Sequence, residues 1–346
     1  APLYIYHLQG HHSFLKDNEK NNNVDNLDIT HLNDNNKYFF LHIYNIDHEI
    51  YYDKDDNLTE LTFGDNFNQP LGPSLNNLTN LKQLTFKYYF NQQLGTSLQT
   101  LTNLQQLTFG SHFSQPLGPS LNNLTNLQQL TFGSFFRQPL GESLDTLTKL
   151  EQLTLGSYFN QELGTSLHTL INLQQLTLGD DFNQPLGISL NNLTNLQQLT
   201  FGDNFNQPLG ISLNNLTNLK QLTFKYFFNQ QLGTSLQTLT NLQQLTFGDG
   251  FNKLLGPFGF FDRKLVISLN NLTNLQQLTF GDDFNKPLGD SLSSLINLKE
   301  LTFGKRFNQE LGTSLNNLTN LQQLKINNLY QGNSILDKIP NITYIH

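Results

Sequence analysis

The stretch Leu61–Gln83, LTFGDNFNQPLGPSLNNLTNLKQ, decides the fold, because it recurs with a period of 23 residues as far as Gln323. Eleven such units, one of them interrupted by ten extra residues, fill this span. When Leu61 is numbered position 1, apolar residues occupy positions 1, 3, 7, 11, 15, 18 and 21. A fixed period of this length is typical of a solenoid, in which each unit is one coil and stacking of neighbouring coils completes the core.

Each unit contains one short segment in which polar and apolar residues alternate. In Gln83-Leu84-Thr85-Phe86 this alternation predicts a half-buried strand with Leu84 and Phe86 pointing inward. One strand per unit predicts a parallel sheet, joined by irregular, short helical or 3₁₀ return segments. The predicted fold class is therefore a mainly β or α/β repeat solenoid.

Two positions after the strand carry nearly invariant residues with structural roles. Position 7 is Phe in all eleven units, and position 8 is Asn in nine of them. We expect these Asn side chains to form an internal ladder that satisfies backbone groups of the adjacent coil. The invariant Gly at position 12 predicts a left-handed or closely packed backbone, and Gly at position 4 suits the turn that leaves the strand.

The same residues carry a resemblance to known repeats. The spacing Leu78-x-x-Leu81-x-x-Leu84-x-Phe86 resembles the leucine-rich-repeat signature LxxLxxLxL. The run LTFGDNFNQPL resembles FNIP-type repeats, a leucine-rich variant of slime moulds and of giant viruses of amoebae, although Phe-Asn replaces the usual Asn-x-Leu and Gln replaces the name-giving Ile. A second resemblance is to bacterial surface-protein repeats with an FNQPL core.

The resemblance implies a leucine-rich-repeat-like solenoid that binds protein partners and lies inside an amoebal host or in a virion. A secreted location stays open. The alternative function is a structural surface or virion-associated protein that self-associates or packs laterally. A third possibility is ice or glycan binding through the outward Gln and Thr rows of the strands.

The repeat also sets the boundaries of the chain. Residues 1–57 fall outside the period and form an irregular amino-terminal segment, in which FFLHIYNI is expected to be a capping strand. Residues 58–323 form the solenoid, interrupted by an insertion at 257–266. Residues 324–346 lose the period and end in IPNITYIH, which predicts a last strand and cap.

Composition argues against several classes of function. The net charge is −8 and only 19 Lys and Arg residues are spread over 346 residues, so we predict no nucleic-acid partner. No apolar run approaches the roughly 18 residues of a membrane span. The sequence has no cysteine and no GxGxxG, Walker, GxSxG or HExxH motif, so we predict no enzyme, cofactor or metal. His7, His11 and His12 lack the spacing of a zinc motif, and a solvated polar segment is the simpler interpretation.

Candidate partner-binding residues lie at positions 4–6, which vary most and directly follow the strand. Aromatic and cationic residues there resemble the usual anchors of interfaces, although the rings alternatively cover neighbouring coils. These candidates are Lys87, Tyr88, Tyr89, His112, Phe135, Tyr158, Lys225, Tyr226, Phe227, Lys305 and Arg306, together with Arg137, which lies two residues after Phe135 at position 8.

The insertion supplies further candidates, because insertions map to one face of a solenoid, often the binding face. They are Phe258, Phe260, Phe261 and Arg263, and the alternative is a loop whose rings fold back onto the core.

Block duplication limits what the repeated aromatics mean. KYYFNQQLGTSLQTLTNLQQLTFG from Lys87 recurs as KYFFNQQLGTSLQTLTNLQQLTFG from Lys225, six units later. Copying alone accounts for the second aromatic pair.

Overall fold

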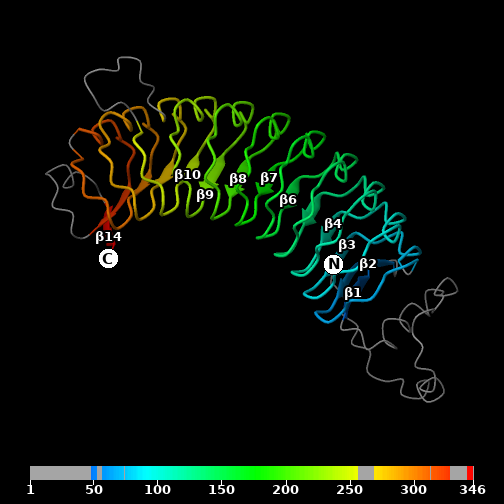
Figure 1. The fold of residues 1–346 in the computed structure, drawn as a ribbon. Coiled ribbons are helices and arrows are strands. Elements are labelled where there is room, and N and C mark those ends of the chain that lie inside the picture. Colours follow the sequence, from blue (N-terminus) through cyan, green and yellow to red (C-terminus); the bar gives the residue numbers. More distant parts are fainter. Residues whose placement is uncertain are drawn as a thin grey trace, which may run out of the picture.

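The computed structural model describes residues 48–52, 57–73, 75–255, 269–311, 313–327 and 341–345. Within these ranges one sheet of fourteen strands runs in sequence order, and the coils stack into an arc (Figure 1). The strands are β1 His48–Tyr52, β2 Leu58–Phe63, β3 Gln83–Phe86, β4 Gln106–Thr108, β5 Gln129–Thr131, β6 Gln152–Thr154, β7 Gln175–Thr177, β8 Gln198–Phe201, β9 Gln221–Phe224, β10 Gln244–Thr246, β11 Gln277–Thr279, β12 Glu300–Thr302, β13 Gln323–Asn327 and β14 Asn341–Ile345.

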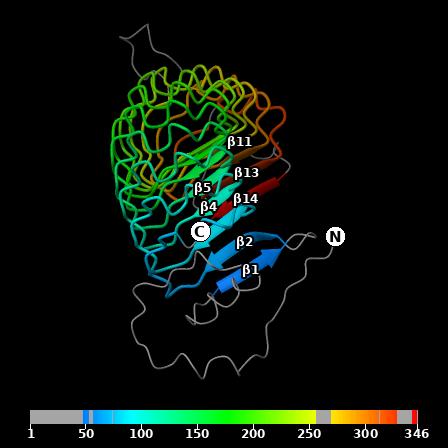
Figure 2. The same ribbon diagram turned by 90° about the vertical axis from the view of Figure 1, so that its right-hand side faces the viewer.

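The sheet is parallel from β2 to β14, and equivalent residues of successive coils pair in register, as Leu84 does with Leu107. Seen along the stack, the strands line up on one side of the coils (Figure 2). At the amino-terminal edge β1 pairs antiparallel with β2, with Ile50 opposite Leu61. The capping strand expected at FFLHIYNI lies outside the described residues. At the other end β14 lies within IPNITYIH.

The core consists of columns of equivalent side chains, which are identical except at position 3, where Leu155 and Leu178 replace Phe. Leu84 and Phe86 are buried and Gln83 and Thr85 are half-buried, which confirms the predicted alternation. The Phe side chains at position 7 stack face to face from coil to coil, with centroids 6.1 Å apart between Phe182 and Phe205. A second column at position 3 packs against them, as Phe201 does against Phe205 at 4.1 Å. The stacks bury the rings and also align the coils.

The predicted Asn ladder is present at position 8. Asn183 Oδ1 accepts a hydrogen bond from the backbone N–H of Asn206 at 2.9 Å and another from Gln207 Nε2 at 3.1 Å. The same pattern links Asn206 to the N–H of Asn229. The expectation of an internal ladder was wrong in one respect, because these groups lie at the surface and are exposed or only part-buried. The bonds therefore hold the turn of each coil to the next from outside the core.

The return segments are successive turns. Leu193, Leu196 and their equivalents donate from the backbone N–H to the carbonyl three residues earlier, and the described return segments contain no helix. Gly at position 12 has the predicted left-handed backbone, with φ of +53° at Gly210. Gly at position 4 serves close packing, because a Cβ on Gly202 would lie 2.1 Å from the carbonyl oxygen of Gly179 in the coil below.

The stacking column predicts where the chain is sensitive to truncation. Phe205→Ala removes a fully buried ring from the position 7 column, and we expect it to lower the free energy of unfolding by about 3–5 kcal/mol. Phe227→Ala is the control, since that ring is 52% exposed and its loss should change stability by at most about 0.5 kcal/mol. Urea denaturation measures both, and equal effects would show that the column does not carry the stability.

Candidate functional site

Backbone hydrogen bonds join the strand exits of successive coils into a continuous ridge. The N–H at position 6 donates to the carbonyl at position 5 of the preceding coil, as His112 does to Tyr88 at 3.0 Å and Phe135 to Ser111 at 2.8 Å. The same bond recurs between Tyr158 and Ser134 at 2.9 Å. Each coil therefore presents its position 5 and 6 side chains directly beside those of its neighbours.

Five rings on this ridge form a continuous row, which we call the aromatic strip: Tyr88, Tyr89, His112, Phe135 and Tyr158. Tyr88 and Tyr89 meet edge to face at 4.7 Å, and both contact the His112 ring, at 4.5 and 5.0 Å. His112 leads on to Phe135 at 4.9 Å, and Phe135 to Tyr158 at 5.1 Å. His112 Nδ1 also lies 3.2 Å from the carbonyl oxygen of Tyr88, which orients the imidazole. Four successive coils thus contribute to one surface.

Four residues of the aromatic strip are exposed and His112 is half-buried. The four Phe and Tyr rings are between 37% and 47% exposed. At the end of the strip the Arg137 guanidinium lies 4.8 Å above the Tyr158 ring, in a cation–π contact. A row of exposed aromatic rings with an arginine is the composition of an interface anchor.

The Asn ladder is altered within the same coils. Ser114 and Arg137 replace Asn at position 8, and the Arg137 N–H accordingly donates to Ser114 Oγ over a longer 3.2 Å. Arg137 itself offers no side-chain acceptor to the N–H of Asn160. Two rungs of the ladder are therefore weakened or lost beside the aromatic strip.

The copied aromatic pair has different surroundings. Tyr226 and Phe227 contact each other at 4.6 Å and are 48% and 52% exposed, but among the described residues neither ring contacts a further ring. The next coil has Gly250 where the coil after Tyr89 has His112. The duplicated block therefore contains the aromatic pair but not the row of ring contacts that extends from Tyr88 and Tyr89.

Three of the predicted cations are bound to carboxylates. Lys305 lies 3.7 Å from Asp282, and Arg306 lies 2.6 Å from Asp283, each pair joining adjacent coils. Lys225 reaches across two coils to Asp180 at 2.7 Å. Its hydrogen bond holds the pKa of the Asp180 carboxyl below the ordinary value, against a smaller opposing effect of burial. These ion pairs neutralise charge along the ridge.

The remaining candidates cannot be placed or add no site. Phe258, Phe260, Phe261 and Arg263, and the three amino-terminal histidines, lie outside the described residues. Over the described ranges, no group of three or more His, Asp or Glu residues is arranged to hold a metal ion. No helix in that part of the chain is long and apolar enough to span a membrane.

Solved structures share this architecture. An internalin from Listeria monocytogenes matches with a TM-score of 0.58 and 20% identity, over 83% of this chain and 87% of its own. The fold is a leucine-rich-repeat solenoid. Toll from the Drosophila Toll–Spatzle complex matches at 0.56 and 17% identity, over 82% of this chain and 40% of its own. TLR13 from its complex with ssRNA13 matches at 0.50 and 17% identity, over 79% and 47%.

These similarities establish the fold alone. The chain spans less than half of the Toll and TLR13 chains. The sequence matches no family model and no curated protein, so the resemblance to FNIP repeats stays a prediction.

The Lys225–Asp180 pair predicts a small acid sensitivity. Because the pKa of Asp180 is lowered in the folded state, the pair stabilises the fold above the unfolded pKa of about 3.9. This contribution is lost as the pH falls through the folded pKa. Both side chains are more than a third exposed, so the contribution is at most about 1 kcal/mol.

Lys225→Met should return the pKa of Asp180 toward its ordinary value, as measured by NMR titration of the carboxyl. An unchanged titration would show that Lys225 does not bind Asp180 in solution.

Proposed function

We propose that this protein is a non-enzymatic, protein-binding solenoid and that the aromatic strip with Arg137 is its principal contact surface. The strip supplies large rings that contact one another along the ridge, so little side-chain entropy is lost when a partner binds. Its four coils occupy one edge of a rigid array, which suits a flat or extended partner surface.

The altered ladder is the observation that carries this proposal. Asn at position 8 binds the next coil in most of the repeat, and each such bond contributes about 0.5–1.5 kcal/mol to stability. Arg137 gives up that bond and instead lies over Tyr158. A local loss of stability that coincides with an exposed aromatic row is the pattern of a site selected for binding.

The charge of the strip differs from that of the rest of the chain. From position 4 to position 8, its four coils contain Lys87 and Arg137 but no Asp or Glu, although the chain has a net charge of −8. The following coils place Asp180, Asp181 and other carboxylates at the same positions. This segregation favours a partner surface with acidic groups beside apolar ones.

Known proteins with this fold support a binding role. Toll is named in a complex with Spatzle, and TLR13 in a complex with ssRNA. A protein partner is the better match here, because the few cations of the described ridge are largely paired with carboxylates. The intracellular or virion setting implied by the FNIP resemblance belongs to the same proposal.

Lateral self-association is the second candidate. Ile188 and Ile211 occupy the same position in adjacent coils and are 65% and 71% exposed. Two such side chains fall far short of the roughly 1,000 Å² that a stable interface buries, so this candidate ranks below the aromatic strip. Sedimentation at high concentration tests it, and a strictly monomeric chain would eliminate it.

Replacing Tyr88 and Tyr89 together with Ser should abolish capture of the partner while leaving the melting transition in place, because both rings are exposed. A photo-reactive residue at position 89 of the otherwise unchanged chain identifies the partner by crosslinking. Tyr226→Ser with Phe227→Ser is the matched control from the duplicated coil. Equal loss of capture in both variants would contradict a site confined to the strip.

Arg137→Asn separates stability from binding. The new Asn restores an acceptor for the Asn160 N–H, so we expect the free energy of unfolding to rise by about 0.5–1.5 kcal/mol. Loss of the guanidinium from the Tyr158 ring should at the same time weaken partner binding. Asn183→Arg is the converse control, since it should destabilise without affecting binding. A variant at Arg137 that is more stable and binds equally well would remove the main argument for the site.

A further inference from the structure

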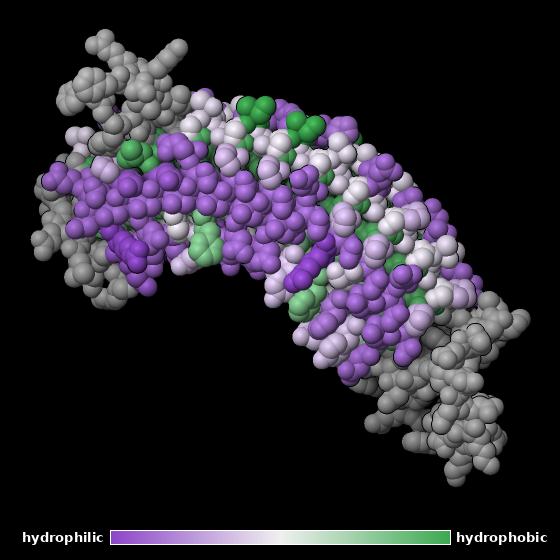
Figure 3. Space-filling model, viewed as in Figure 1, coloured by the Kyte–Doolittle hydropathy of each residue, from purple (hydrophilic) through white to green (hydrophobic). Residues whose placement is uncertain are grey.

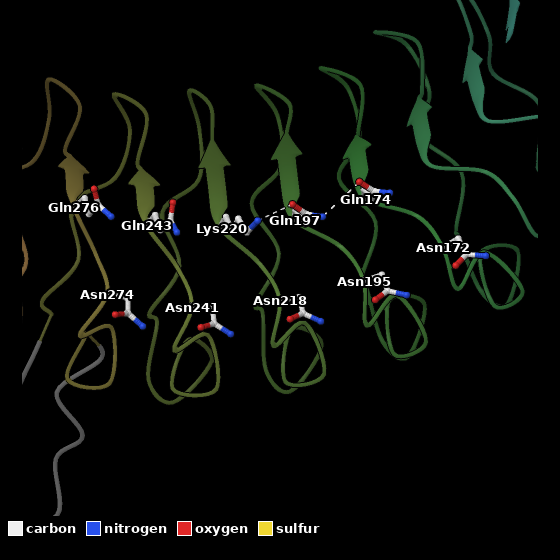
Figure 4. Close-up of a pocket in the computed structure, with 10 residues that line it drawn as sticks. All are labelled: Asn172, Gln174, Asn195, Gln197, Asn218, Lys220, Asn241, Gln243, Asn274 and Gln276. Carbon is white, nitrogen blue, oxygen red and sulfur yellow. Dashed lines mark hydrogen bonds between the residues drawn. The ribbon is translucent and has the colours of Figure 1, made fainter. Parts of the chain in front are cut away.

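A polar groove runs along the coils on the strand-entry side, away from the strand-exit ridge. It extends from Asn172 to Gln276, crosses five coils and has a volume of about 560 Å³. One wall is the row of Asn at position 20 and the other is the row at position 22, which is Gln except for Lys220 (Figure 4). On the face seen in Figure 3, hydrophilic side chains form a continuous belt along the coils.

The groove follows from the local sequence Asn-Leu-Gln. Leu196 is buried, so Asn195 and Gln197 on either side of it point outward together. The N–H groups of Gln197 and Gln198 both donate to the carbonyl of Gln174, at 2.8 and 2.9 Å. Gln197 immediately precedes β8, and its side chain lines the groove.

The Asn wall is held in a fixed orientation. Asn195, Asn218 and Asn241 each donate from Nδ2 to a backbone carbonyl of the preceding coil at 2.9 Å. Their amide oxygens therefore repeat at one per coil, about 4.8 Å apart. The opposite wall is adaptable, since Gln197 contacts Gln174 at a long 3.4 Å and accepts from Lys220 at 2.9 Å.

The chemistry of the groove selects one class of ligand. The groove does not suit an apolar ligand, because none of the ten residues that line it is apolar. It does not suit a polyanion either, because Lys220 is the one cation among them. A peptide strand finds no open sheet edge, because the floor N–H groups of Leu196 and Gln197 already donate within the solenoid. Hydroxyl groups both donate and accept hydrogen bonds, so they match fixed amide oxygens and mobile amides equally well.

We infer that this groove binds a neutral, extended glycan chain, with about one hexose unit per coil. The site is independent of the aromatic strip, and it differs from the outward Gln and Thr rows of the sheet. It ends at the coil where Lys149 and Glu151 replace Asn and Gln at positions 20 and 22. A shorter groove, whose lining includes Lys82, runs from Asn80 to this coil and ends at Lys149.

Isothermal titration calorimetry with cellohexaose, laminarihexaose and maltohexaose tests the inference on the full chain. At least one hexasaccharide should bind saturably. Gln174→Ala with Gln243→Ala should weaken its affinity about tenfold, because two hydrogen-bonding side chains leave the groove wall. The matched control is Gln175→Ala with Gln244→Ala, which changes the neighbouring residues of the same coils on the sheet face and should leave the affinity unchanged.

Several results would overturn the inference. These are absence of binding by all three sugars, equal loss in both double variants, or binding confined to a sulfated hexasaccharide and abolished by Lys220→Ala. The Tyr88→Ser and Tyr89→Ser variant should retain full sugar binding. Sugar binding by this variant therefore tests the groove separately from the proposed protein-binding strip.

Discussion

In-register stacking of equivalent residues is the interaction on which the rest of the structure depends. The strands of the repeat pair equivalent residues one coil apart, the Phe side chains at position 7 stack on one another, and Asn at position 8 binds the next turn. No single coil can satisfy these groups by itself, so folding is cooperative along the array. The requirement that every coil match its neighbours explains why the core positions and Gly210 with its equivalents scarcely vary.

The residues of the proposed aromatic strip lie at positions that stacking leaves unconstrained. Side chains at positions 5 and 6 leave the ridge backbone outward, so they vary without disturbing the paired N–H and carbonyl groups beneath them. Arg137 shows how far this freedom extends, because it sacrifices one ladder acceptor at the surface but leaves the buried columns intact. Truncation of a side chain in the buried columns would lower the free energy of unfolding several times more than the loss of one such surface hydrogen bond.

The duplicated block shows that the same local sequence yields different surfaces. Lys87-Tyr88-Tyr89 continues into His112 of the next coil, whereas Lys225-Tyr226-Phe227 is followed by Gly250 and has its lysine bound to Asp180. Both blocks have the same local chain geometry, with strands that extend to position 3 at Phe86 and Phe224. What differs is the neighbouring coil, and the neighbour decides whether exposed rings join into a strip.

The sequence by itself determined the period, the parallel strands, the inward Leu and Phe positions, the left-handed Gly at position 12 and the Asn ladder. Each of these follows from a rule that repeats with the chain, such as the alternation of Gln83 to Phe86. Only the tertiary structure decided that Lys225 skips a coil to reach Asp180, that the rings from Tyr88 to Tyr158 touch, and that Asn195 and Gln197 wall a groove. The physical reason is that periodicity fixes which residues face out, whereas the directions of outward side chains depend on the curvature and neighbours of the stacked coils.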